Sequence, residues 1–426
     1  MDSRTKALCD FLDAAHSVYH AQAYLAETLK NAGYTRLYEQ DEWPLVPGGK
    51  YFLTRGGSAI VAFRVPEGSP KGFLMSASHS DRPTFKVKEN FELAAAYTRM
   101  AVERYGGMLI APWLDRPLSI AGRVTVETET GVETKLLDID RDLLLIPNVA
   151  IHMNRQANEG YKWNPAADTL PLIGSAGAAG KLPALLEKEA GGKILGHDLY
   201  LYIRQKASVW GVDEEYISSA ALDDLECAWG CTQGFLKGKD SASIPVLCVF
   251  DSEEVGSVSP QGAGSSLLED TLGRICDSLK LNRGRMLAQS FLVSADNAHA
   301  VHPNHPEYAD PGNAPVMGGG LVIKYNANLS YCTDSVSAAV FRKICGRAGV
   351  RVQTYHNRAD LPGGSTLGRI SLAHVSVPTV DIGLAQLAMH SCFETAAVSD
   401  AIDLENAMAA YYGAALEATQ TGFVIR

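Results

Sequence analysis

Val246-Leu247-Cys248-Val249-Phe250-Asp251-Ser252-Glu253-Glu254-Val255-Gly256-Ser257 is the stretch from which the rest of the chain can be interpreted. Its unbroken apolar run, Val246 to Phe250, indicates a β-strand buried on both faces. In an α/β sheet the ligand crevice lies at the carboxyl ends of such strands. Here that end carries Glu253 and Glu254. Two adjacent carboxylates are costly to bury without a cation, so a solvated acidic turn is the simpler alternative for this pair alone.

The composition is that of an ordinary globular protein. The chain has 426 residues, 46% of them hydrophobic and 20% charged, and a net charge of −10. The length predicts two or three domains, and the negative charge argues against a nucleic-acid surface. No apolar run approaches the ~20 residues of a membrane span, and the first residues lack the apolar core of a secretory signal. We therefore expect a cytoplasmic protein that binds neither membranes nor nucleic acid.

The eight cysteines are scattered, and several lie inside apolar runs. This pattern fits free buried thiols in a reducing compartment. Cys227 and Cys231 could form half of a metal site, but no second Cys/His pair at zinc-finger spacing accompanies them.

The order of predicted elements indicates an α/β protein with an insertion. Residues 1–35 have helical spacing, and the spacing of Ser266 and Glu269 predicts a capping box that opens a later helix. Strands with α/β texture are predicted at 58–65, 72–78, 290–295, 321–325, 350–355 and 379–383, with a closing helix at 404–418.

Residues 90–212 differ from this texture. Alternating segments at 123–128 and 132–136 flank a glycine turn and predict a β-hairpin. A further alternating segment spans 197–203, and a short helix is predicted near 183–190. We therefore predict a discontinuous domain of residues 1–89 and 213–426, interrupted by a β-rich domain at 90–212.

Several predicted strands end at residues that can bind metal ions. These residues are His79, Glu253, Glu254, Asp296 and His390, with the pair Asp223-Asp224 at the start of the second α/β segment. Each is weak evidence alone, but their shared position is informative. Histidine and carboxylate ligands suit Zn²⁺, Mn²⁺ or Co²⁺, and a bridging carboxylate can hold two ions ~3.5–4 Å apart. Asp81 is placed to hold the second ring nitrogen of His79.

Other site motifs are missing from the sequence. It has no Gly-x-Gly-x-x-Gly after a strand, no Walker loop, no His-Glu-x-x-His and no Gly-x-Ser-x-Gly. His299, His302 and His305 form a His-rich segment, but its two prolines indicate a rigid loop. For these three we prefer a supporting or structural role over direct metal contact.

The chain resembles the aspartyl aminopeptidase family of dinuclear zinc aminopeptidases. The family's motifs occur in order and span nearly the whole chain: Ala77-Ser78-His79-Ser80-Asp81-Arg82-Pro83, Ala150-Ile151-His152, Leu222-Asp223-Asp224, Asp251 to Ser257, Ser294 to Asn304, Gly364-Ser365-Thr366 and Gln386 to Ser391.

The resemblance implies a fold and a set of roles. The fold would be an α/β metallopeptidase domain, with a mixed central sheet flanked by helices, interrupted by a β-rich dimerisation domain. Asp223 would bridge two divalent ions, which the family implies are zinc. One ion would also bind His79 and Asp296, and the other Glu254 and His390. Glu253 would be the general base.

The resemblance also implies an assembly. In the family, the histidine that matches His152 enters a neighbouring subunit's active site, and dimers build a tetrahedral dodecamer. Lys324 matches a lysine near the substrate pocket, where it could pair with an acidic side chain, although a structural ion pair is an alternative.

The chain departs from the family in three places. The family commonly has Asp-Asn where Asp223-Asp224 stands, which leaves open which aspartate bridges. Arg82 replaces a smaller residue, and residues 360–366 differ from the Cys-Gly form of acid-specific members. A preference for N-terminal Asp or Glu is therefore open.

The expected function is removal of the N-terminal residue from peptides by a two-metal aminopeptidase. Two other functional hypotheses are alternatives to it. One is a related dinuclear carboxypeptidase or N-acyl amino acid deacylase. The other is an inactive scaffold or cargo-binding shell, against which the full ligand set and Glu253 argue.

Overall fold

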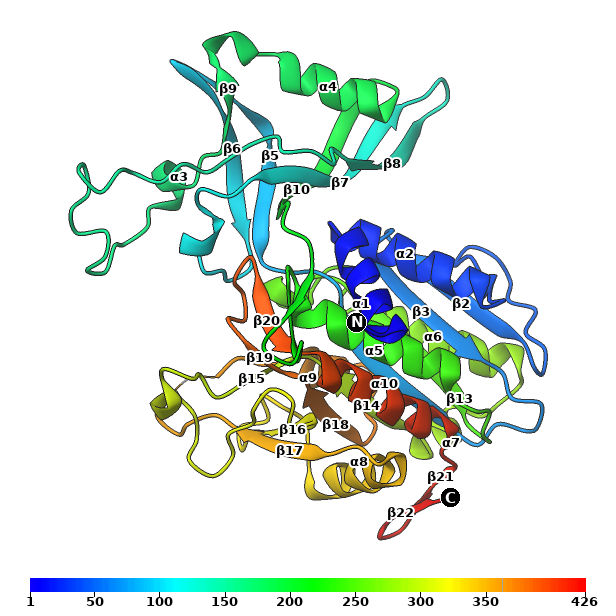
Figure 1. Cartoon of the computed structure of the whole chain (residues 1–426). Coiled ribbons are helices and arrows are strands. Elements are labelled where there is room, and N and C mark those ends of the chain that lie inside the picture. Colours follow the sequence, from blue (N-terminus) through cyan, green and yellow to red (C-terminus); the bar gives the residue numbers. More distant parts are fainter. Residues whose placement is uncertain (362) are drawn as a thin grey trace.

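A nine-stranded mixed sheet forms the centre of the body of the protein (Figure 1). The structure is a computed structural model that describes residues 1–361 and 363–426. In spatial order the strands are β1 (Thr35–Arg36), β2 (Lys50–Arg55), β3 (Ala59–Arg64), β13 (Ile244–Phe250), β4 (Phe73–His79), β14 (Phe291–Ala295), β18 (Thr379–Gly383), β16 (Leu321–Tyr325) and β17 (Val352–His356).

Strand β13 lies inside this sheet, as its apolar run predicts. It pairs antiparallel with β3 and parallel with β4, and all seven of its residues are buried. Leu247 and Val249 belong to the hydrophobic core on one face, whereas Val246 and Cys248 belong to the core on the other. Helices cover both faces because both are apolar.

The helices around the sheet come from all parts of the chain. Helices α5 and α10 pack against each other on one face, together with α1. The helices of the body are α1 (Ser3–Ala14), α2 (Val18–Asn31), α5 (Leu222–Lys237), α6 (Leu267–Ser278), α7 (Arg283–Ala288), α8 (Ser335–Ala348), α9 (Leu367–Ser371) and α10 (Val398–Gly413), whereas α3 (Pro165–Asp168) and α4 (Lys181–Ala190) lie outside it (Figure 1). No helix within the described ranges is long and apolar enough to cross a membrane.

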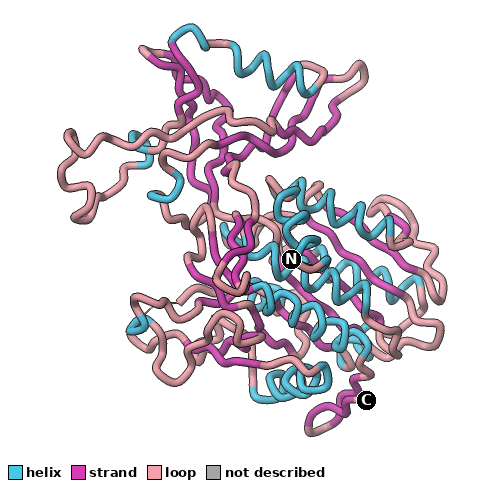
Figure 2. The backbone as a smooth tube through the Cα atoms, in the orientation of Figure 1, coloured by secondary structure: helices cyan, strands magenta, loops and turns pink. Residues whose placement is uncertain are grey.

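A six-stranded antiparallel sheet forms a separate lobe with its own core, above the body in Figures 1 and 2. Its main helix, α4, matches the helix predicted near 183–190. The first strand begins before residue 90, inside the segment assigned to the other domain. In spatial order the strands are β8 (Val132–Asp138), β7 (Leu118–Glu127), β10 (Ile194–Ile203), β5 (Thr84–Ala94), β6 (Tyr97–Tyr105) and β9 (Leu172–Ser175).

A smaller five-stranded sheet lies between the lobe and the body (Figure 1). Its strands are β11 (Ser208–Trp210), β12 (Tyr216–Ser219), β20 (Glu394–Ala397), β19 (Ala385–Leu387) and β15 (Ala298–His299). A terminal hairpin of β21 (Leu416–Thr419) and β22 (Gly422–Ile425) completes the chain. The mixed α/β class expected from the sequence is confirmed.

The segment 1–35 is mostly helical, as predicted, and it forms two helices because Ser17 adopts an extended conformation and its side chain caps α2. Two other local predictions were wrong. Ser266 does not form the predicted capping box, because its backbone is already helical and its hydroxyl donates to Asp270. The closing helix ends at Gly413, since Ala414 is extended and the chain continues into the terminal hairpin.

Candidate metal centre

The carboxyl ends of four parallel strands place the predicted site residues at one edge of the central sheet. β13, β4, β14 and β18 are parallel neighbours. Phe250 lies beside His79 in the register, and Asp296 directly follows the last residue of β14. Parallel strands end at the same edge, so the apolar runs themselves bring these polar residues together.

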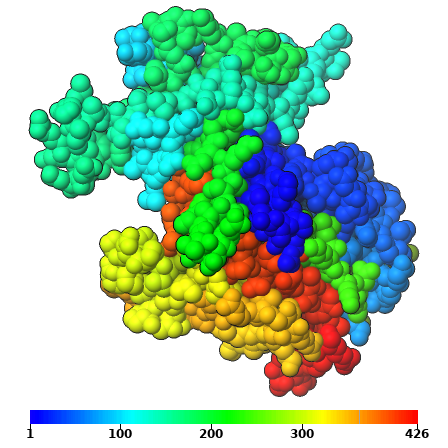
Figure 3. Space-filling model, in the orientation of Figure 1, coloured from blue at the N-terminus to red at the C-terminus, as the bar shows by residue number. Residues whose placement is uncertain are grey.

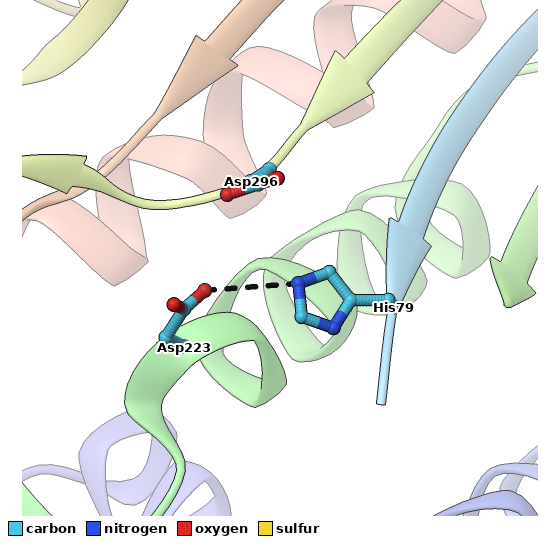
Figure 4. Close-up of side chains that lie close together, drawn as sticks. All are labelled: His79, Asp223 and Asp296. Atoms are coloured by element: carbon cyan, nitrogen blue, oxygen red, sulfur yellow. Dashed lines mark ion pairs between the residues drawn. The ribbon is translucent and has the colours of Figure 1, made fainter. Parts of the chain in front are cut away.

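The ring of His79 is held by Asp81, which lies two residues later in the sequence. Its ring is buried, and its Nδ1 lies 3.2 Å from the Asp81 carbonyl oxygen and 3.3 Å from Asp81 Oδ1. The other ring nitrogen, Nε2, lies 3.7 Å from Asp223 Oδ1 (Figure 4). The predicted contact of Asp81 with the second ring nitrogen is therefore present, and Nε2 faces the other site residues.

Asp81 also positions the acidic pair. Its carboxylate accepts the backbone N–H of Glu253 at 3.0 Å and that of Glu254 at 3.1 Å. Tyr105, which comes from the six-stranded lobe, donates its hydroxyl to Asp81 at 2.7 Å. One buried carboxylate thus connects the ends of β4 and β13 with the lobe.

Asp223 and Asp224 point in different directions at the start of α5. Asp223 Oδ2 lies 3.4 Å from His390 Nε2, while Oδ1 faces His79. Asp224 instead accepts the backbone N–H of His79 at 3.1 Å. Of the two aspartates, only Asp223 faces both predicted histidine ligands.

The residues form three overlapping groups whose ligand atoms lie within 4.8 Å of one another. Figure 4 shows the first group. The groups are His79 with Asp223 and Asp296, His79 with Glu253 and Glu254, and Asp223 with Glu254 and His390. Asp223 Oδ1 and Glu254 Oε1 are buried and have no hydrogen-bond partner among the described residues. These orphaned oxygens and the nitrogen and oxygen donors fit divalent cations such as Zn²⁺.

Burial and mutual repulsion make the charged forms of these clustered carboxylates electrostatically unfavourable. Burial raises the pKa of Glu253 to about 8 and raises those of Glu254 and Asp296 as well, and neighbouring carboxylates add to each rise. Burial also opposes ionisation of Asp223, but the contacts with His390 and His79 lower its pKa overall. Bound cations would remove the repulsion and favour the ionised forms.

A cleft of about 300 Å³ opens onto this cluster. Glu253 lines it together with His79, Asp223, Asp296 and His390, whereas Glu254 does not. Of the His-rich segment, only His299 lines the cleft. Gly364, Ser365 and Thr366 border it too, while Pro362 of the unusual 360–366 stretch lies outside the described residues.

Lys324 lies on the cleft wall but is already engaged. Its side chain is 1% exposed, and its Nζ donates to the backbone carbonyls of Asp296 at 2.6 Å and Asn297 at 3.1 Å. The Asp296 carboxylate lies 3.6 Å away. The lysine therefore stabilises the turn that carries Asp296, and its charge borders the cleft.

His152 is not brought to the cluster within one chain. It lies in an exposed turn of the loop that precedes α3, and this loop protrudes from the lobe (Figures 1 and 3). It is not among the residues that line the cleft.

Glu394 was missed by the sequence interpretation. It is 1% exposed and accepts the backbone N–H of Asp223 at 3.0 Å and that of His390 at 2.7 Å. Burial and the nearby Asp223 raise its pKa, while these two donors oppose that rise. The available signal was its position four residues after His390, in an otherwise apolar segment.

Comparison with known proteins gives one consistent result. The family described as "Aminopeptidase I zinc metalloprotease (M18)" matches residues 11–412. A Clostridium acetobutylicum protein named "Probable M18 family aminopeptidase 2" is 42% identical over 423 residues, which cover 96% of this chain and 98% of that protein.

Solved structures show the same similarity. The structure described as "Cryo-EM structure of the Ape4 and Nbr1 complex" has a TM-score of 0.93 at 35% identity, covering 96% of this chain and 85% of that one. The "S. cerevesiae mApe1 dodecamer" has a TM-score of 0.85 at 25% identity, covering 96% of each chain.

The raised carboxyl pKa values predict how pH affects the metal-free protein. The pKa of Glu253 rises from its ordinary 4.5 to about 8 on folding. The folded state therefore holds a proton that the unfolded state releases, so stability falls as pH increases across this range. After chelation, we expect the melting temperature to be several degrees lower at about pH 8 than at about pH 5.5, with a larger gain from added Zn²⁺ at the higher pH.

Scanning calorimetry of the chelated and zinc-loaded protein at both pH values checks this expectation. Glu253→Gln serves as the control, and it should lose less stability between the two pH values because that titration is removed. A chelated wild-type protein that melts higher at about pH 8 would contradict the argument.

Proposed function

The chain belongs to the M18 family of aminopeptidase I zinc metalloproteases, and we propose that this metal-dependent aminopeptidase uses two divalent ions at the edge of its central sheet. The family assignment confirms the resemblance found in the sequence. The observation that carries the two-ion proposal is Asp223, the residue shared by the group with His79 and Asp296 and the group with Glu254 and His390.

The ligand groups support a division of the residues between two ions. One ion would be held by His79 and Asp296, the other by Glu254 and His390, and Asp223 would be a ligand of both. The orientation of Asp224 toward the His79 backbone favours Asp223 as the bridge. The family favours zinc, and Mn²⁺ or Co²⁺ suits the same donor types.

We assign the neighbouring glutamates different roles. Glu254 contacts His390 at 3.4 Å and stays out of the cleft, as a ligand would, whereas Glu253 lines the cleft. Ions held by these residues would polarise the scissile carbonyl and lower the pKa of a bound water molecule to about 7. Glu253 takes the water proton and returns it to the departing amine. The free amine of the substrate would lie near one ion and the neighbouring carboxylates of the site, and this would limit cleavage to the first residue.

Lys324 provides a positive charge on the cleft wall, and an acidic N-terminal side chain would complement it. Its bonds to two backbone carbonyls support a structural role as well. We propose N-terminal Asp or Glu as the preferred substrate class.

His152 and the assembly form one linked proposal. The histidine lies on a protruding loop (Figure 1) and does not line the cleft of its own chain, which supports a role at the cleft of a neighbouring subunit. We propose that it donates to the developing oxyanion of a neighbour's substrate. The mApe1 relative is a dodecamer, and we propose that this chain forms dimers that build the same kind of homo-oligomer.

We propose a catalytic domain at about 1–89 and 213–426 and a dimerisation domain at about 90–212. The separate core of the six-stranded lobe supports two domains, and it moves the first boundary a few residues earlier, because strand β5 of the lobe begins at Thr84. The contact between Tyr105 and Asp81 couples the two parts next to the ligands.

Glu253→Gln should keep both metal ions but lose roughly 10²- to 10⁴-fold in kcat, because general base catalysis contributes that much. Elemental analysis and peptide turnover measure the two quantities. Near-wild-type turnover would sink the general-base role. Asp223→Ala is the contrasting variant: it should lose metal, and unchanged zinc content would contradict the bridge.

His152→Phe should lower kcat by roughly 10²- to 10³-fold without changing zinc content, since one oxyanion donor is lost. Mixing it with Asp223→Ala under conditions of subunit exchange should restore part of the activity. The mixed pair contains one site with intact metal ligands and a partner's intact His152. Activity that stays at the level of the separate variants after verified exchange would argue against a shared site.

A panel of aminoacyl-nitroanilides, with acyl-amino acids as controls, tests the substrate class. We expect kcat/KM for Asp and Glu to exceed that for Leu by roughly tenfold or more, as one ion pair of about 1.4 kcal/mol would give. A preference for neutral residues would remove Lys324 from substrate recognition. Hydrolysis of acyl-amino acids alone would instead favour the hypothesis of a deacylase. Inactivity with every metal tested would favour the hypothesis of an inactive scaffold.

A further inference from the structure

One buried carboxylate, that of Glu394, joins two segments that carry predicted ligands of the same ion. Its Oε2 accepts the backbone N–H of Asp223 at 3.0 Å, and its Oε1 accepts that of His390 at 2.7 Å. We propose that Glu394 is a positioning residue that fixes the separation of Asp223 and His390 and thereby the affinity of the ion they share. This inference rests on the two-ion site proposed above.

The backbone N–H of Asp223 needs a hydrogen-bond acceptor from outside α5. The first N–H groups of a helix lack partners within the helix. At the start of α5, Asp223 and Asp224 also have non-helical backbone angles, and the N-cap residue, Ala221, provides no side-chain bond. Strand β20 begins at Glu394 and pairs antiparallel with β12, with Ser219 opposite Glu394. The sheet therefore places the Glu394 side chain beside the chain as it enters α5.

The segment around His390 also depends on contacts from outside it to fix its backbone. Ala388 and His390 both have left-handed backbone conformations, with φ of 57° and 66°. Such conformations are costly for non-glycine residues and persist where surrounding contacts fix them. The His390 N–H is held by Glu394, and its carbonyl accepts the N–H of Leu109 at 3.0 Å. Contacts on both sides of the residue therefore define where the imidazole points.

A carboxylate is the group that this geometry requires. Two backbone donors need two acceptor oxygens, whereas an amide offers one acceptor and turns a donor toward the second N–H. Arg82 lines the same small cavity as Glu394 and Asp223, so a positive charge lies close to this buried group. Asp81 acts comparably on the other side of the site, where it holds His79, Glu253 and Glu254.

The test measures metal binding in Glu394→Gln. One of the two bound ions should bind roughly 10- to 100-fold more weakly, the usual effect of removing a partner that orients ligands. Dialysis against a graded zinc chelator, followed by elemental analysis, measures this loss. In the Co²⁺-substituted protein, the visible absorption of one ion should change, whereas a role confined to overall stability would leave it unchanged.

Two further variants test whether metal affinity depends on the position of the Glu394 carboxylate or only on a buried negative charge. Glu405→Gln removes a buried carboxylate of α10 that pairs with Lys237 of α5, and it should leave both affinities unchanged. Glu394→Asp keeps the charge but withdraws the oxygens by one methylene, so it too should bind one ion more weakly. It also provides the measurement if Glu394→Gln does not fold.

The outcomes distinguish this inference from the proposed function. Wild-type affinities and an unchanged Co²⁺ spectrum in Glu394→Gln, or in Glu394→Asp, would overturn the positioning role. If Asp223→Ala loses metal in the same assay, the two-ion site stands and only the role of Glu394 falls. If Asp223→Ala keeps both ions, the site assignment itself fails.

Discussion

Repulsion among carboxylates in a confined space is the constraint on which the site depends. Glu253, Glu254, Asp223 and Asp296 converge where four parallel strands end, and burial disfavours the charged form of each. A fold stabilised by a large apolar sheet can hold such a cluster. The unfavourable electrostatic free energy is small compared with the free energy gained by burying apolar surface elsewhere. Cations convert the same cluster from a cost into a binding site.

The backbone around the cluster is organised by carboxylates that do not themselves face the cleft. Asp81 connects β4 to the loop after β13, and Glu394 connects the start of α5 to the loop after β19. Each connects segments far apart in sequence. Pocket residues on irregular loops thereby acquire the fixed geometry that metal binding and proton transfer need.

Much of the fold and most of the ligand cluster could be predicted from local patterns. Val246 to Phe250 is buried on both faces because every residue in it is apolar, and the position of Glu253 follows from where that run stops. Features that depend on distant contacts could not be predicted in this way. The acceptor role of Glu394 requires knowing that β20 pairs with β12. The failed capping box at Ser266 depends on a backbone conformation that spacing does not encode.

The position of β13 has a consequence for how the chain acquires its structure. β3 and β4 follow each other in sequence, yet β13 lies between them and pairs with both. During synthesis, the central sheet therefore stays open until the entire six-stranded lobe has left the ribosome. Long-range closure of this kind is slow, and the exposed strand edges invite wrong pairing meanwhile. His390 follows later still, so the residue cluster at the edge of the sheet is incomplete until most of the chain has been made.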